Sequence, residues 1–244
     1  MRWCLVVLVL FISIFSFFGI DKIKDIDILS EEWIDATGKD GKGLYWDIMR
    51  AVYEPEGVKV NYKNLSYEGA VKMLGQKKTD AILGSYNDEI DNAVYPKYHF
   101  GVDVVKALFK KSSDHKIITQ DDLFNKNIGW IKGYEYDSYL SVKVKKFEYT
   151  EREFALKALL NNRIDAFIDA EEDILELINE QSLNMSEFEL VTIIELNLFV
   201  AFADTSKGRS LRDMFDRRLE VLIKSGELKK IFKKWEKSGF KYPY

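Results

Sequence analysis

Short apolar segments alternate with helically patterned ones at the start of this chain. The expected order is strand, helix, strand, helix, strand over residues 22–29, 45–53, 58–62, 67–74 and 77–85. The strands are short and apolar, whereas the helical segments repeat apolar residues every three or four positions, and Ser66 can cap the second helix. Because strands separated by helices pair in parallel, this order predicts an α/β body with a mainly parallel sheet and helices on its faces.

A second body of the same kind follows. Its expected strands are residues 127–131, 164–168 and 189–194, and its expected helices are residues 151–160 and 172–180. Two more apolar segments, 103–110 and 196–202, carry the chain out of the first body and back into it. The predicted lobes are therefore residues 22–101 with 197–244, and residues 102–196.

The strand at residues 77–85 ends in Gly84 and Ser85, and an acidic loop at residues 87–92 follows it. In an open α/β sheet, ligands bind outside the carboxyl ends of the strands. Glycine at such an end lets the backbone approach a ligand closely. We therefore expect a binding site here, with Gly101 as a candidate flexing point between the lobes. The alternative is an ordinary strand and surface loop.

Residues 3–20 carry no charge and follow Met1 and Arg2. A basic start and an apolar run are typical of a secretory signal peptide, which is not part of the mature fold. At 18 residues, the run is also long enough to remain as an uncleaved N-terminal anchor. Under either interpretation, residues 1–21 lie outside the fold and the rest of the chain is exported.

The composition argues against several classes of site. The single cysteine, Cys4, falls in the apolar run, so the rest of the chain offers no disulfide, thiol nucleophile or thiolate metal site. The net charge is −4, and no basic stripe with interleaved aromatic residues indicates nucleic-acid binding. We expect one of the two histidines, His115, to be solvated and the other, His99, to pack beside the first crossing segment. No GxSxG or HExxH motif and no metal-ligand spacing occurs, so no metal and no cofactor is expected.

Several weak motifs occur in a characteristic order. They are GLYWDIMRA at residues 43–51, TDA at 79–81, NIG at 127–129, RIDA at 163–166 and SGELKKIFKKW at 225–235. In this order the chain, over roughly residues 22–236, resembles the extracytoplasmic solute-binding proteins of family 3, which serve amino-acid ABC transporters.

The resemblance implies a type II periplasmic-binding-protein-like fold of the α/β class. Such a fold has two lobes, each a mainly parallel sheet flanked by helices, and two crossover strands about which the lobes close over a ligand. The resemblance further implies a monomer in the periplasm, without a cofactor and without nucleic acid as a partner. Its partners would be a small-molecule solute and a membrane transporter permease or sensor.

The resemblance also implies which residues bind the ligand. In the first lobe they are two aromatic residues that stack on the ligand, Trp33 and Tyr67, and a loop of backbone and hydroxyl contacts, Ser85 and Tyr86. In the second lobe they are a loop that binds a carboxylate at a helix start, Lys132, Gly133 and Tyr134, and Asp169, beside which the family keeps an acid for the α-ammonium group.

The chain departs from this pattern at one position. Amino-acid binders of the family carry an arginine after the glycine strand, because guanidinium binds a carboxylate through two parallel hydrogen bonds. No Lys or Arg lies between residues 78 and 97. Glu89 takes the arginine's place when positions are counted back from Tyr95, and Asp91 takes it when they are counted forward from Gly84.

An acid at this place disfavours a ligand carboxylate, because two facing carboxylates in a poorly hydrated cleft repel each other. We therefore expect a cationic, amine-bearing or neutral solute, with Asp88, Glu89 or Asp169 as counter-charge and aromatic rings as cation–π partners. The alternative is that the acids point to solvent and Lys132 alone holds an anionic ligand.

Two other functions are open on this scaffold. Some relatives of the fold are dehydratases, so an enzyme is the first alternative, although the sequence indicates no catalytic residue. The second alternative is a cleft that binds no solute and serves as a sensor or a partner contact. The sequence favours a binding protein without chemistry of its own.

Overall fold

The computed structural model describes residues 22–111 and 117–244. The predicted signal peptide or anchor at residues 1–21 and the predicted solvated His115 lie outside the described residues. None of the helices in the described ranges is both long and apolar enough to cross a membrane.

Lobe 1 contains the first and last elements of the described chain. Its strands are β1 (Asp25–Ser30), β2 (Lys59–Asn64), β3 (Ala81–Ser85) and β4 (Ala93–Val94), and its helices are α1 (Leu44–Tyr53), α2 (Tyr67–Gly75), α5 (Ser206–Ser225) and α6 (Glu227–Lys234). Short 3₁₀ helices, Glu54–Glu56 and Glu236–Ser238, follow α1 and α6. The Ser66 hydroxyl accepts a hydrogen bond from the Gly69 N–H and caps α2, as predicted.

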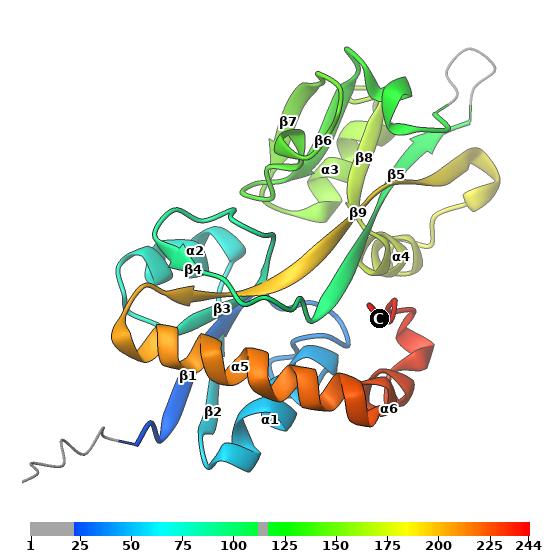
Figure 1. Ribbon diagram of the computed structural model, residues 1–244. Helices are drawn as coiled ribbons and strands as arrows, with labels where there is room; N and C mark the ends of the chain where they lie inside the picture. Colours follow the sequence, from blue (N-terminus) through cyan, green and yellow to red (C-terminus); the bar gives the residue numbers. More distant parts are fainter. Residues whose placement is uncertain (1–21, 112–116) are drawn as a thin grey trace, which may run out of the picture.

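Lobe 2 is smaller and contains the middle of the chain. Its strands are β6 (Asn127–Ile131), β7 (Lys145–Tyr149) and β8 (Ala166–Ala170), and its helices are α3 (Arg152–Leu160) and α4 (Glu171–Glu180). Three 3₁₀ helices, Gln120–Leu123, Tyr136–Ser138 and Met185–Glu187, lie in its connections. Figure 1 shows the two lobes at opposite ends of a pair of long strands.

The two long strands, β5 (Gly101–Lys110) and β9 (Phe188–Ala203), join the lobes. They pair antiparallel, from Gly101 opposite Leu198 to Lys110 opposite Phe188. The strand order is β2-β1-β3-β9-β5-β8-β6-β7, with β4 also paired to β9. The outer strands of each lobe are parallel to one another, which confirms the predicted α/β fold class. His99, just before β5, packs against Phe199 and Tyr244, as predicted.

The structure corrects two details of the predicted strands. Residues 189–194 and 196–202 form one strand, β9, because Glu195 is an exposed position that pairs with Val104 and the ladder continues past it through one register shift at Ile193. β7 was not predicted, since its sequence KKFEY has no apolar run and nearly all of it is exposed at the sheet edge. The lobe boundaries near residues 101 and 197 fall inside β5 and β9 and stay a prediction.

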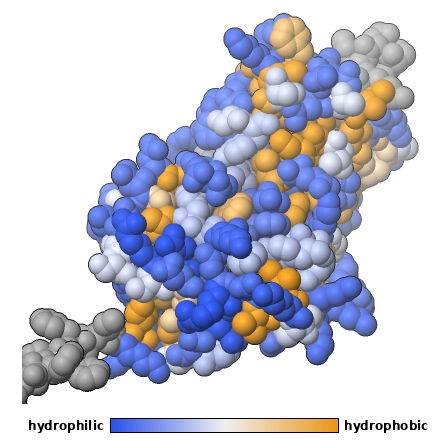
Figure 2. Space-filling model, in the orientation of Figure 1, coloured by the Kyte–Doolittle hydropathy of each residue, from blue (hydrophilic) through white to orange (hydrophobic). Residues whose placement is uncertain are grey.

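The apolar core continues from lobe 1 into lobe 2. In lobe 1, α1 buries Trp46 and Ile48 completely, and α5, which packs on α1, contributes Phe215 to the same buried cluster. In lobe 2, Trp130 of β6 and nearby Tyr136 belong to the same buried cluster. A smaller cluster lies under α3 and α4. In the view of Figure 2, hydrophilic side chains cover much of lobe 1, and apolar ones are more frequent over lobe 2.

Gly84 and Gly75 provide a matched test of the close packing at the end of β3. At Gly84, φ is +83° and an added Cβ would lie 2.3 Å from the Trp33 ring. At Gly75, the last residue of α2, an added Cβ meets no atom within 4 Å. We expect Gly84→Ala to lower the free energy of unfolding by about 1–3 kcal/mol, and Gly75→Ala to raise it by about 0.4–1 kcal/mol. Urea denaturation measures both; a harmless Gly84→Ala would contradict the contact.

Candidate ligand-binding site

A cavity lies between the lobes, at the carboxyl ends of parallel strands from both. Trp33 follows β1, Gly84 lies in β3, Tyr134 follows β6 and Ala170 ends β8, and all of them line it. Open α/β sheets bind ligands at this edge. The space inside is about 50 Å³, and one water needs roughly 10–15 Å³ of such space. The lobes are therefore in a closed arrangement, and the cavity between them holds only a few waters.

Aromatic rings form much of the cavity wall. They belong to Trp33, Tyr45, Tyr67, Tyr86, Tyr134, Tyr136 and Phe240. The rings of Tyr67 and Tyr134 meet edge to face across the lobes, with 6.1 Å between their centroids. Trp33 meets Tyr45 in the same manner at 6.5 Å. Because the faces of aromatic rings attract positive charge, this wall suits a cation.

Four carboxyl side chains line the same cavity: Glu89, Asp103, Glu172 and Asp173. Among the described residues of the lining, none is Lys, Arg or His. Burial raises the pKa of Asp103 to about 6 and the pKa of Glu172 to about 7. Burial also raises the pKa of Glu89, although a hydrogen bond from the Tyr86 N–H opposes this shift. The cavity is therefore acidic, and its charge changes with pH near neutrality.

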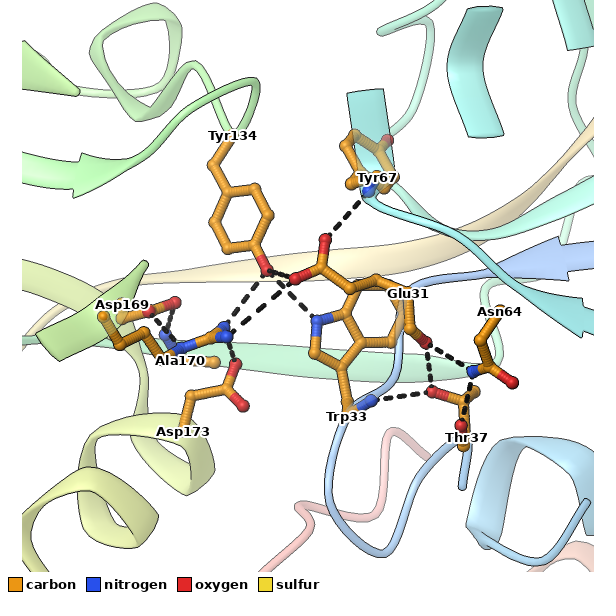
Figure 3. A network of polar contacts seen from close by, with 10 residues as sticks. Glu31, Trp33, Thr37, Asn64, Tyr67, Tyr134, Asp169, Ala170 and Asp173 are labelled. Atoms are coloured by element: carbon orange, nitrogen blue, oxygen red, sulfur yellow. Dashed lines mark hydrogen bonds and ion pairs between the residues drawn. The ribbon is translucent and has the colours of Figure 1, made fainter. Parts of the chain in front are cut away.

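The two lobes meet at the Tyr134 hydroxyl (Figure 3). Trp33 Nε1 of lobe 1 donates a hydrogen bond to this oxygen at 3.1 Å, and Arg152 Nη2 of lobe 2 donates another at 3.1 Å. The hydroxyl in turn donates to Glu31 Oε1 at 3.4 Å. The other oxygen of Glu31 accepts a bond from the Tyr67 N–H at 2.8 Å. One phenol thus links the loop after β1 to α3 in the closed conformation.

Arg152, at the start of α3, is held by two buried carboxylates. Its Nε donates to Asp169 Oδ2 at 2.9 Å, and its Nη2 donates to Asp173 Oδ2 at 2.5 Å. Asp169 also accepts a bond from the Ala170 N–H. Burial raises the pKa of both acids, and the guanidinium opposes the rise. The positive charge of Arg152 is therefore balanced mainly within lobe 2, while Glu31 of lobe 1 lies 3.9 Å from its Nη1.

Arg152 is not among the residues that the sequence predicts for the site, and neither are Asp103 and Asp173. Arg152 follows β7, so recognising that edge strand would have placed it at a strand end, as Trp33 and Tyr134 are. An acid in a strand or in the first turn of a helix is usually solvated, so nothing in the local sequence distinguishes the two aspartates.

Seven of the predicted ligand-binding residues lie at the cavity. Trp33, Tyr67, Tyr86, Glu89 and Tyr134 line it, and Ser85 and Asp169 are fully buried behind its walls. Ser85 is bonded to Glu89, and Asp169 is bonded to Arg152. Their roles toward a ligand stay a prediction.

The other three, Asp88, Lys132 and Gly133, border a second, more open hollow. Asp88 is exposed. Lys132 pairs with Glu68 across the lobes at 3.1 Å, and its side chain is 53% exposed. Asp91 and Glu89 border this hollow as well, and of the acids in the loop at residues 87–92 Glu89 also lines the cavity between the lobes.

Removal of the Arg152 charge should destabilise the protein in a pH-dependent manner. Arg152→Met leaves Asp169 and Asp173 buried without a cation, and breaking such a pair costs roughly 3–5 kcal/mol. We expect a larger loss of unfolding free energy at pH 7.5 than at pH 5, because protonated acids need no counter-charge. Arg163→Met, at an exposed position in the same lobe, is the matched control. An equal loss at both pH values, measured by urea denaturation, would contradict the assignment.

The sequence profile of the bacterial extracellular solute-binding proteins, family 3, matches residues 31–238. A curated relative is the L-cystine-binding protein TcyJ of Escherichia coli (strain K12). It is 26% identical over 140 residues, which cover 54% of this chain and 52% of the relative. The match thus spans about half of that relative's length.

Solved structures share the two-lobed architecture. An ancestral arginine-binding protein bound to arginine has a TM-score of 0.68 at 22% identity, covering 88% of this chain and 99% of that chain. A histidine kinase sensor domain with similarity to periplasmic binding proteins has a TM-score of 0.72 at 16% identity, covering 91% and 100%. These likenesses show the type II periplasmic-binding-protein fold. Since the family profile covers most of its length, the chain belongs to the bacterial extracellular solute-binding proteins, family 3.

Proposed function

We propose that this protein is an extracytoplasmic solute-binding protein that closes its lobes over a small, polar, amine-bearing solute and presents it to a membrane transporter. The observation that carries the proposal is the lining of the cavity. Four carboxyl side chains and seven aromatic rings face it, and no base occurs among the described lining residues. Cystine and arginine, the named ligands of two similar proteins, both carry amino groups.

A positively charged nitrogen would offset the cost of burying these acids. Desolvation disfavours the ionised form of Asp103 and Glu172, which is why their pKa values are raised. A cation nearby favours the ionised form, and a ring face adds roughly 0.5–2 kcal/mol to its binding. A carboxylate solute would instead add a like charge, so the lining supports an amine over an organic acid.

The contacts between the lobes support a closing motion. Tyr134 accepts a hydrogen bond from Trp33, and Lys132 pairs with Glu68; each contact joins one lobe to the other. The lobes are connected through β5 and β9, so bending of these strands would open the cavity. A solute held by both lobes adds to these contacts and thereby shifts the population toward the closed shape.

Thermal unfolding with charge-matched solutes tests the proposal. 1,5-Diaminopentane and glutarate have carbon chains of equal length and opposite charge. We expect an amine, at about a hundred times its Kd, to add about 2.7 kcal/mol and raise the Tm by several degrees, whereas glutarate should leave it unchanged. Asp103→Asn should reduce the shift. Glu180→Gln, at an exposed position at the end of α4, should not.

Three other outcomes would contradict the proposal. A shift with organic acids alone would show that a base outside the lining holds an anion. Product formation from a bound amine, followed by mass spectrometry, would favour an enzyme on this scaffold. No shift with any solute would favour a sensor or partner-contact role.

The buried acids also predict a pH dependence of definite sign. In the closed protein the pKa of Asp103 is raised to about 6 and the pKa of Glu172 to about 7, above ordinary values of about 4. The folded state therefore holds these protons more tightly, and its stability falls as pH rises from about 4 to about 7. Because a cationic solute favours the ionised acids, the Tm shift that it causes should be larger at pH 7.5 than at pH 5. The pH dependence of the stability and that of the Tm shift should both become weaker in the Asp103→Asn, Glu172→Gln double variant. An unchanged pH dependence would contradict the assignment.

A further inference from the structure

Three donors converge on one oxygen of Glu89. The Tyr86 N–H and the Tyr67 hydroxyl each donate to Glu89 Oε2 at 2.7 Å, and the Ser85 hydroxyl donates at 3.0 Å. Backbone N–H and hydroxyl groups in this arrangement bind carboxylate oxygens well, because hydrogen bonds to an anion are short and strong. The anion that they hold here is a side chain of the protein itself.

A chain of hydrogen bonds orients these donors. The Ile90 N–H donates to the Tyr95 hydroxyl at 3.0 Å, and that hydroxyl shares a hydrogen bond with Ser85 Oγ at 2.8 Å. Ser85, which is fully buried, has two acceptors for its own proton, Glu89 Oε2 at 3.0 Å and the Tyr86 carbonyl oxygen at 3.1 Å. An acceptor at the end of the chain completes it, and Glu89 supplies that acceptor.

We infer that Glu89 fills the carboxylate subsite of this cavity, so that the solute is a small organic cation without a carboxylate. The inference rests on the proposed function, solute binding between the lobes. Glu89 lines the cavity together with Asp103 and Glu172, so a solute carboxylate would meet their charge without the three donors. The guanidinium of Arg152 does not replace those donors, because Asp169 and Asp173 already bind it.

The remaining lining suits a charged nitrogen. The rings of Trp33, Tyr86 and Tyr134 border the same space as the acids. Rings beside carboxylates bind ammonium, guanidinium and quaternary ammonium groups. Such a cation can be held while Glu89 keeps its hydrogen bonds, whereas a carboxylate could gain the donors only by displacing Glu89.

Pairs of solutes that differ by one carboxylate test the inference. They are 1,5-diaminopentane and lysine, agmatine and arginine, and histamine and histidine. In isothermal titration calorimetry, we expect the wild-type protein to bind the carboxylate-free member of a pair at least about tenfold more tightly, because the amino acid leaves its buried carboxylate without donors.

Two variants separate the two effects of Glu89, which are to occupy the three donors and to add a negative charge. Glu89→Ala frees the three donors and removes one acid, so the affinity ratio within a pair should move toward the amino acid by about tenfold or more. Glu89→Gln keeps an oxygen in the subsite without its charge, so it should weaken amine binding and still exclude the amino acid. Asp91→Ala, at an exposed position in the same loop, is the matched control and should leave the ratio unchanged.

The outcomes distinguish this inference from the proposed function. A wild-type protein that binds an amino acid as tightly as its amine overturns the inference and leaves solute binding intact, as does an unchanged ratio in Glu89→Ala. Binding of neutral or anionic solutes alone also overturns it. If no solute binds the wild-type protein, the proposed function fails as well. Should Glu89→Ala not fold, the wild-type ratio and Glu89→Gln still decide.

Discussion

Antiparallel pairing of β5 with β9 is the constraint on which both lobes and the cavity depend. The sheet continues from this pair into lobe 1 through β3 and into lobe 2 through β8. The same two strands contribute Asp103 and Leu198 to the cavity. The strands that connect the lobes thus also form part of the cavity wall. Bending that separates the lobes also acts on Asp103, which accepts a hydrogen bond from the Tyr86 hydroxyl of lobe 1 at 2.7 Å.

Closure sets a desolvation cost against polar contacts between the lobes. Asp103 and Glu172 lie partly buried between the lobes, and this desolvation penalises their ionised forms. The hydrogen bonds at Tyr134 act in the opposite direction, since they join Trp33 to lobe 2. A cation in the cavity would offset the desolvation cost of the acids and leave the hydrogen bonds at Tyr134 in place. Conversion of a population from 1% closed to 99% closed needs a ligand that binds the closed state more tightly by about 5.5 kcal/mol. Pairing of a cation with the acids would contribute to that difference, because it favours the closed state.

Sequence periodicity predicted most of the fold because the buried strands are short apolar runs and the helices carry one apolar face. It failed where the pattern is weak, at the exposed strand β7 and at Glu195 within β9. Glu89 could be found because the resemblance marks one position where a base is expected. Arg152 and Asp173 could not, because their partners are distant in sequence and only the folded lobe brings them together. The ring of Phe240 is a further case, since it reaches the cavity from beyond residue 238, where the family match ends.

The distribution of charge and aromatic rings between the lobes suggests an order for binding. Five of the cavity rings, including Trp33 and Phe240, belong to lobe 1, whereas Glu172 and Asp173 belong to lobe 2. Phe240 stays with lobe 1 through its contact with Tyr45, 5.7 Å between ring centroids. When the lobes separate, a wall with most of the rings and one acid, Glu89, therefore faces a wall with more acids and two rings, Tyr134 and Tyr136. A cation can bind either wall alone, through a ring face or through a carboxylate, but it gains both only when the lobes close. Under the proposed function, closure is thus coupled to a positive charge in the cavity, and a neutral apolar molecule would leave Glu172 of lobe 2 without a counter-charge there.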